Sequence, residues 1–375
     1  MDKSSCKILV TGSRGFLGKN LCTALVDRGY GNVCEFDRES SMDELREALK
    51  DCRYIFHLAG VNRPLDRKEF YHSNGDLTET ICRTLIDEKN YPTIILASST
   101  QACLNNDYGK SKKIAEDTLF LYSQTTGAPV YVFRFPGVFG KWCKPNYNSV
   151  VATFCHQIAR DGSIRIDAPT KEIELLYIDD VCDMFCGILE RSYPIMNKGF
   201  CRVSPTTKIS LEDLANTIKE FHVQRSAGIL PDISSDFNKK LYSTYLSYLP
   251  VENLSVRPVV KSDERGSFAE LFKTEHVGQV SMCRVNPGST RGNHRHNTKT
   301  EKFAVIGGSG CLRLRDAYGS GVCEIPIDGA NPEIVDIPPG VTHSIVNTGD
   351  DILITLIWAN ELFNEDKPDT IFDEV

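Results

Sequence analysis

The chain has 375 residues, of which 41% are hydrophobic and 25% are charged, proportions typical of folded globular proteins. Its formal net charge of −7 argues against nucleic acid or an anionic membrane as the main partner. No stretch approaches the roughly 18 consecutive apolar residues of a membrane span, and because the N-terminal residues are polar we expect no export signal. We expect two domains in a cytoplasmic protein, with its fourteen scattered cysteines reduced.

Residues 1–250 alternate short apolar runs with amphipathic segments, which is the pattern of βαβ units around a parallel sheet. The expected strands are Lys7–Val10, Val33–Phe36, Tyr54–Leu58, Thr93–Ser98 and Val130–Phe135. The helices expected between them include Leu17–Arg28 and Asp107–Thr125. The predicted fold is a Rossmann-type, doubly wound α/β sheet. A helical tail and a packed linker are expected to follow it, from about residue 198 to residue 250.

Residues 251–375 have a different sequence pattern, in which short apolar runs are interrupted by Gly, Asn, Pro and Asp. Regularly spaced short strands without a long helical pattern indicate an all-β sandwich or barrel. The expected strands are Val280–Val285, Phe303–Val305, Cys311–Leu314, Ile334–Ile337 and Ile352–Trp358. We therefore place the domain boundary after residue 250.

A glycine-rich turn follows the first strand and opens a helix. It reads Thr11-Gly12-Ser13-Arg14-Gly15-Phe16-Leu17-Gly18. Glycines there let the backbone approach a pyrophosphate, and the helix N-terminus offers free N–H groups. The strand–turn–helix context predicts a dinucleotide site. Its expected contacts from this turn are Gly12, Arg14, Gly15, Phe16, Leu17 and Gly18.

The end of the second strand bears on which dinucleotide is bound. Asp37 would accept a hydrogen bond from the ribose 2′-OH of NAD, whereas Arg38 or Arg14 would meet the 2′-phosphate of NADP. Two guanidinium groups favour NADPH, with NADH as the alternative. After the third strand, Leu58, Ala59 and Gly60 should pass under the adenosine, and His57 is expected to be a structural histidine.

Tyr108 and Lys112 lie four residues apart, on one face of a predicted helix. A tyrosine normally titrates near about pH 10. We expect the Lys112 ammonium to lower the pKa of Tyr108 and to hold the nicotinamide ribose, which would make Tyr108 a general acid for carbonyl reduction. A hydroxyl after the fourth strand would bind the substrate carbonyl. Ser99 is preferred and Thr100 is the alternative.

In this order and spacing, the motifs resemble the extended short-chain dehydrogenase/reductase family over about residues 1–250. The match also includes Asn74, Arg134–Gly140 and Tyr177–Val181. The nucleotide-sugar dehydratases of that family carry an Asp-Glu pair after the catalytic Thr, where this chain has Gln101-Ala102. Because elimination would lack its proton donor and acceptor, we expect simple ketone reduction.

The C-terminal domain contains a candidate metal site made of His294, His296, Glu301 and His343. We expect the first two on one strand face and the other two on neighbouring strands. Three imidazoles and a carboxylate suit Zn²⁺, Fe²⁺, Mn²⁺ or Ni²⁺, and zinc is preferred because no redox step is needed. The spacings resemble the two motifs of the cupin family, except that Pro332 replaces a turn glycine.

The fusion resembles a family of bifunctional enzymes of capsular polysaccharide synthesis over the whole chain, including Lys141–Asn148 and Leu241–Pro250. The resemblance implies that the cupin domain epimerises C3 of UDP-2-acetamido-2,6-dideoxy-4-hexulose. It implies that the N-terminal domain then reduces C4 with NADPH to UDP-2-acetamido-2,6-dideoxy-L-talose, a precursor of N-acetyl-L-fucosamine. Epimerisation must come first, because the C3 proton is acidic only while C4 is a ketone. A homodimer is also expected.

Several assignments stay open at this point. Candidate substrate contacts are Arg134, Asn148 and Arg165, and the base for the C3 proton could be Arg295, Lys299 or Lys302. One alternative is a monofunctional NADPH-dependent reductase with a structural or dimerising cupin. Another is an NAD-dependent nucleotide-sugar 4-epimerase, which would hold its cofactor tightly and consume no NADPH.

Overall fold

The computed structural model describes residues 3–61, 70, 75–274, 277–317, 319–366 and 368–375. The chain divides into two compact units, one of residues 1–219 and 234–250 and one of residues 220–233 and 251–375. The boundary after residue 250 stays a prediction, since residues 220–233 group with the second unit. Among the described residues, no helix is long and apolar enough to cross a membrane.

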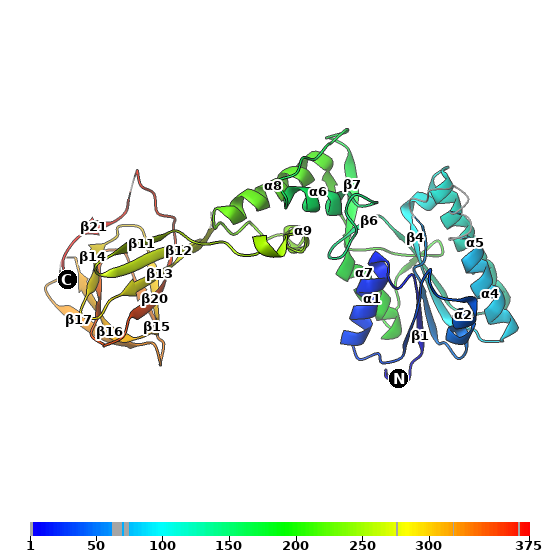
Figure 1. Cartoon of the computed structure of the whole chain (residues 1–375), viewed down its shortest axis with the longest axis horizontal. Coiled ribbons are helices and arrows are strands. Elements are labelled where there is room, and N and C mark those ends of the chain that lie inside the picture. The colour runs from blue at the N-terminus through cyan, green and yellow to red at the C-terminus, as the bar shows by residue number, and fades with distance from the viewer. Residues whose placement is uncertain (1–2, 62–69, 71–74, 275–276, 318, 367) are drawn as a thin grey trace. The chain divides into compact units, whose positions relative to one another are not determined.

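A seven-stranded sheet with the order β2-β1-β3-β4-β5-β9-β8 forms the centre of the first unit (Figure 1). Its strands are β1 (Ile8–Thr11), β2 (Val33–Phe36), β3 (Tyr54–His57), β4 (Thr93–Ser99), β5 (Val130–Phe135), β8 (Met196–Asn197) and β9 (Phe200–Cys201). The first five strands pair in parallel, which confirms the predicted Rossmann-type sheet. A smaller sheet with the order β10-β7-β6 contains β6 (Gly137–Phe139), β7 (Glu172–Tyr177) and β10 (Thr207–Ser210).

Helices cover both faces of the large sheet. On one face lie α1 (Phe16–Asp27) and α7 (Ile178–Leu189), and on the other lie α2 (Met42–Leu49), α4 (Leu77–Asp87) and α5 (Asp107–Thr126). The other helices are α6 (Val150–Ile158), α8 (Leu211–Ser226) and α9 (Asp236–Leu246), with short 3₁₀ turns η2 (Thr100–Cys103) and η3 (Val251–Asn253). Successive residues of β1 point to opposite faces. Ile8 and Val10 pack in a cluster with α1 and α7, whereas Leu9 packs with α2, α4 and α5.

Helix α5 carries two of the predicted catalytic residues, and its local sequence explains its two ends. The Asn106 side chain accepts a hydrogen bond from the Gly109 N–H at 2.7 Å and caps the first turn. Gly127, with a φ of 77°, ends the helix in the left-handed conformation. The Cβ-free Gly109 is needed there, since an added Cβ would lie 2.2 Å from the Gln101 carbonyl oxygen.

The second unit contains two antiparallel sheets, with the orders β11-β12-β13-β20-β15-β18 and β17-β16-β19-β14-β21. Their strands are β11 (Val260–Asp263), β12 (Gly266–Thr274), β13 (Gly278–Val285), β14 (Thr290–Arg295), β15 (Glu301–Gly307), β16 (Ser309–Asp316), β17 (Val322–Asp328), β18 (Ile334–Ile337), β19 (Val341–Asn347), β20 (Leu353–Ala359) and β21 (Ile371–Phe372). Inward residues of both sheets, such as Val285, Phe303 and Ile345, share one apolar core. This confirms the predicted all-β, cupin-type fold.

Candidate active site and metal centre

The glycine-rich turn between β1 and α1 has the geometry that a pyrophosphate requires. Gly12 has a φ of +69°, and a Cβ there would lie 2.8 Å from the backbone of Ala59. A Cβ on Gly18 would lie 2.1 Å from the Gly12 carbonyl oxygen. The N-cap residue Gly15 offers no side-chain cap to α1. The first N–H groups of the helix can therefore bind an anion.

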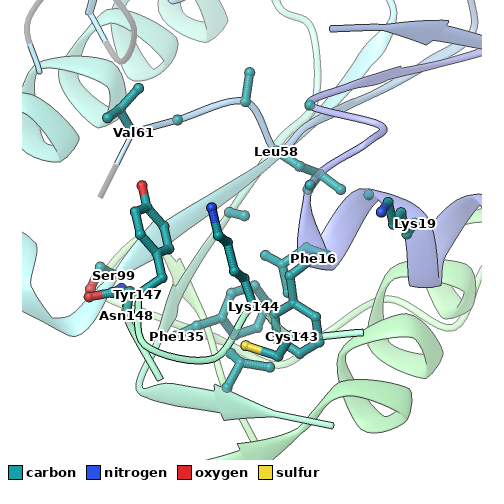
Figure 2. Close-up of a pocket in the computed structure, with 18 of the residues that line it drawn as sticks. Phe16, Lys19, Leu58, Val61, Ser99, Phe135, Cys143, Lys144, Tyr147 and Asn148 are labelled. Carbon is teal, nitrogen blue, oxygen red and sulfur yellow. The ribbon is translucent and has the colours of Figure 1, made fainter. Parts of the chain in front are cut away.

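A cavity of about 1140 Å³ extends from this turn along the carboxyl ends of the parallel strands (Figure 2). Ser99, Tyr108 and Lys112 line the same cavity. The predicted cofactor residues that line it are Gly12, Arg14, Gly15, Phe16, Leu17, Gly18, Asp37, Arg38, Leu58, Ala59, Gly60 and Lys112. The structure thus brings the predicted cofactor and catalytic residues into one space. Asn74 lies outside the described residues.

Asp37 is held in place by the backbone around it. One carboxylate oxygen accepts the N–H of Arg14 at 2.7 Å, and the other accepts the N–H of Arg38 at 2.8 Å. The hydroxyl of Ser40 also accepts the Asp37 N–H, at 3.1 Å, and lines the cavity. The Arg14 guanidinium pairs with the exposed Glu39. Asp37 therefore orders both segments that carry the candidate phosphate-binding arginines, the glycine-rich turn with Arg14 and the end of β2 with Arg38.

Tyr108 is influenced by burial more than by Lys112. Burial raises the pKa of Tyr108, and a hydrogen bond with Ser99 acts in the opposite direction. Lys112 is itself buried, which lowers its pKa to about 8, and its Nζ donates to the Ala97 carbonyl at 3.2 Å. The prediction that Lys112 lowers the pKa of Tyr108 was therefore wrong for this state, because desolvation dominates and the ammonium is bound to the strand.

His57 has the structural role that was expected of it. Its Nδ1 lies 2.8 Å from the Thr11 hydroxyl and its Nε2 lies 2.8 Å from the Thr78 hydroxyl. Complete burial lowers the pKa of His57 to about 3, so the ring is neutral at physiological pH. It joins β3 to β1 and α4.

The loop of residues 141–149 supplies part of the cavity wall, and it includes the predicted substrate contact Asn148. Figure 2 shows Lys144 and Tyr147 extending from this loop into the cavity. The Tyr248 hydroxyl donates to the Cys143 carbonyl at 2.5 Å and fixes the loop from the side of α9. Residue type alone did not reveal this contact, because Tyr248 lies about a hundred residues further along the chain.

The other two predicted substrate contacts lie outside this cavity. Arg134 directs its guanidinium at the buried Glu116, with Nε 2.8 Å and Nη2 2.6 Å from the two carboxylate oxygens. Arg165 is 88% exposed and pairs with Asp167 at 2.6 Å. The guanidinium groups of Arg134 and Arg165 are therefore already paired with carboxylates of the protein, Glu116 and Asp167 respectively.

In the second unit, the four predicted metal ligands converge. One potential ligand atom from each of His294, His296, Glu301 and His343 lies within 4.8 Å of the others. His294 on β14 pairs in register with His343 on β19. Two details differ from the prediction. His296 follows the end of β14, after a bulge at residues 292–294, and Glu301 comes from the other sheet.

The chemistry of this cluster fits a divalent cation. The Nδ1 atoms of His296 and His343 contact the backbone carbonyls of Asp369 and Val341, which can only accept hydrogen bonds. A neutral ring with its proton on Nδ1 turns a lone pair on Nε2 toward the Glu301 Oε2, which lies 3.3 Å from the His296 Nε2 and 3.2 Å from the His343 Nε2. All three of these acceptor atoms are buried, and none finds a donor among the described residues. A cation would satisfy them together.

Asp369 supports this centre from the C-terminal segment, which sequence reasoning did not identify. Its carboxylate accepts the backbone N–H groups of Asn297, Thr298 and Lys299 at 2.9, 2.7 and 2.9 Å. It therefore fixes the turn between His296 and Glu301. Of the three candidate bases, Lys299 is buried, while Lys302 pairs with Asp336 and Arg295 lies 3.8 Å from Asp373.

Comparison with known proteins agrees with both units. The NAD dependent epimerase/dehydratase family matches residues 8–199, and the polysaccharide biosynthesis C-terminal domain matches residues 261–371. A Pseudomonas aeruginosa protein named UDP-2-acetamido-2,6-beta-L-arabino-hexul-4-ose reductase is 43% identical over 364 residues, which cover 97% of each chain.

Solved structures are similar in the same way. The capsular polysaccharide assembling protein CapF from Staphylococcus aureus has a TM-score of 0.93 and 41% identity, covering 98% of this chain and 100% of its own. The Thermotoga maritima UDP-glucose 4-epimerase is 19% identical with a TM-score of 0.54. It covers 64% of this chain and 97% of its own, and it is similar in fold alone. The chain therefore belongs to the NAD dependent epimerase/dehydratase family, in the CapF-like group that carries a polysaccharide biosynthesis C-terminal domain.

Proposed function

We propose that the chain is a bifunctional nucleotide-sugar enzyme of capsular polysaccharide synthesis. Its first unit reduces C4 of a UDP-linked 2-acetamido-2,6-dideoxy-4-hexulose, and its second unit first epimerises C3. The observation that supports the reduction best is the cavity in which Ser99, Tyr108 and Lys112 meet the glycine-rich turn. The name of the Pseudomonas aeruginosa relative supports the choice of a UDP-linked 4-keto amino sugar as substrate.

In the reduction, bound NADPH supplies the hydride. The Ser99 hydroxyl binds the carbonyl oxygen, and Tyr108 donates the proton that turns the developing alkoxide into an alcohol. Ser99 already interacts with Tyr108 in the free protein, so the two groups are placed to share one substrate oxygen. The Lys112 side chain holds the ribose of the cofactor. Gln101 and Ala102 offer no carboxylate for dehydration.

NADPH is preferred over NADH because of the residues around the second strand. Both carboxylate oxygens of Asp37 already accept backbone N–H groups, so part of its hydrogen-bonding capacity is used within the protein. Arg14, Arg38 and Ser40 line the cavity at the same place and can bind a 2′-phosphate.

For the epimerisation, we propose that His294, His296, Glu301 and His343 hold a divalent metal, with zinc preferred. When bound, the metal supplies positive charge for the oxyanion that develops as the C3 proton leaves. Since that proton is acidic only while C4 is a ketone, epimerisation precedes reduction. Lys299 is the proposed base among the three candidates, because it is the buried one beside the ligands.

Cofactor consumption tests the reductase proposal. The purified chain, given the 4-keto sugar, should oxidise one NADPH per product, and Tyr108→Phe should abolish this reaction. Tightly bound NAD without net NADPH oxidation would instead identify a 4-epimerase.

Deuterium exchange separates the epimerase from a structural cupin. The full-length Tyr108→Phe chain, loaded with zinc and without NADPH, should incorporate deuterium at C3 of the 4-keto sugar in D₂O. A folded, metal-loaded chain that incorporates none would assign the cupin a structural or dimerising role. The homodimer stays a prediction, which sedimentation equilibrium can test.

A further inference from the structure

Glu116 is a completely buried carboxylate in the reductase unit, one helical turn after Lys112 on α5. Each of its oxygens is engaged. The Ser98 hydroxyl donates to Oε1 at 2.6 Å, and the Arg134 guanidinium donates to both oxygens at 2.8 and 2.6 Å. Such a residue costs free energy to bury unless every partner is present. Its partners come from β4 and β5, the two strands that end beside the catalytic residues.

We propose that Glu116 is a positioning residue of the reductase, whose negative charge keeps Lys112 in its cationic, cofactor-holding form. The inference rests on the proposed function, because it assigns Lys112 to the nicotinamide ribose. Glu116 does not line the cavity and acts through Lys112. It also ties the helix that carries Tyr108 and Lys112 to Ser98, the neighbour of Ser99.

The charges around Lys112 explain why this anion matters. Burial favours the neutral amine of Lys112, and Glu116 is the group that opposes that effect. His57 on β3 faces Lys112 but is neutral. Tyr108 is on the same helix, and burial raises its pKa, so it also stays neutral.

The charges that face Glu116 itself are positive. Arg134 on β5 is bound to it, and its Cζ lies 3.7 Å from the centroid of the Phe200 ring. Lys113 on α5 lies 3.9 Å away and is also paired with Asp117 at 2.5 Å. The Cys103 thiol of η2 contacts Arg134 and not Glu116. Arg134, predicted from the sequence as a substrate contact, is therefore assigned to this network.

The test is the pH dependence of NADPH binding, measured as a dissociation constant by cofactor fluorescence on the full-length chain from pH 6.5 to 9.5. Wild-type affinity should fall as the pH rises through about 8, where Lys112 loses its charge. In Glu116→Gln, which keeps the side-chain shape and removes the charge, the same fall should begin about one pH unit lower. Because Glu116→Gln leaves Arg134 without its partner, the double variant Glu116→Gln/Arg134→Met is measured beside it and should shift in the same direction by a smaller amount, since it also removes the positive charge of Arg134.

Ser98→Ala is the matched control, because it removes one hydrogen bond to Glu116 and leaves the charge. The NADPH affinity of Ser98→Ala should fall over the same pH range as that of the wild-type chain. An equal shift in Ser98→Ala, or no shift in both charge variants, would overturn the inference and leave Glu116 a packing residue. A wild-type chain that does not bind NADPH overturns the proposed function and this inference with it. If the wild-type chain binds NADPH and its affinity falls at alkaline pH, but the fall occurs over the same pH range in both charge variants, the inference alone is overturned.

Discussion

Asp369→Ala tests how the metal centre is built from distant parts of the chain. The carboxylate accepts three backbone N–H groups at 2.7–2.9 Å and the Thr298 hydroxyl at 3.1 Å. A hydrogen bond contributes about 1 kcal/mol net, and partial solvent exposure reduces the effect of the charge. Loss of all four bonds should therefore destabilise the second unit by about 2–4 kcal/mol.

The effect on the metal should be larger than on the fold. The turn released by Asp369→Ala joins His296 to Glu301, and the backbone carbonyl of residue 369 fixes the His296 ring. Loss of a residue that orients ligands typically weakens metal binding about 10- to 100-fold. We expect this increase in the zinc dissociation constant, measured by competition with a chromophoric chelator.

Asp366→Ala is the matched control, because it removes the same charge from the same segment. Among the described residues, the Asp366 carboxylate has no hydrogen-bond partner. It should change zinc affinity less than twofold. Equal zinc affinities in the Asp369→Ala and Asp366→Ala chains would refute the role assigned to Asp369.

Three further predictions concern the reductase unit. Gly18→Ala should raise the dissociation constant of NADPH at least tenfold, because its Cβ would lie 2.1 Å from the Gly12 carbonyl oxygen, whereas Gly321→Ala, with open space around it, should not. Arg38→Ala should reduce the preference for NADPH over NADH by about 10- to 100-fold in steady-state kinetics, the worth of a charge-assisted phosphate contact, and an unchanged ratio would remove Arg38 from the phosphate site. Tyr248→Phe should raise the KM for the UDP-sugar several-fold and leave the KM for NADPH unchanged, because the lost hydrogen bond holds the loop at Cys143; equal increases in both constants would contradict this.

The sequence predicted the parallel strands of the first unit well, because most are short apolar runs whose residues are largely buried, as in β1, β3 and β4. It was less informative in the second unit. Strand β14, with the sequence Thr-Arg-Gly-Asn-His-Arg, has no apolar alternation, and β17 is largely exposed. Such strands are set by pairing with neighbours, which a local pattern does not reveal.

For the candidate sites too, local sequence patterns identified some features and missed those that depend on long-range contacts. Ligand type and spacing identified His294, His296, Glu301 and His343, which the structure brings together. The sequence did not reveal that Glu301 reaches them from the facing sheet, or that Asp369 orders the intervening turn. Arg134 was taken for a substrate contact because the partner that engages it, Glu116, becomes its neighbour only in the fold. Long-range pairing explains each of these differences.

The central claim is tested most directly by the structure of the product. The wild-type chain is incubated in D₂O with zinc, NADPH and the 4-keto sugar, and the product is isolated. Epimerisation changes the configuration and the hydrogen isotope at C3, and reduction places a hydroxyl group at C4. Nuclear magnetic resonance of the one product measures both changes. We predict a 4-hydroxy product with inverted configuration and deuterium at C3, and no such product from Glu301→Gln. A reduced product that retains the original configuration and protium at C3 would contradict the account of two ordered reactions in one chain.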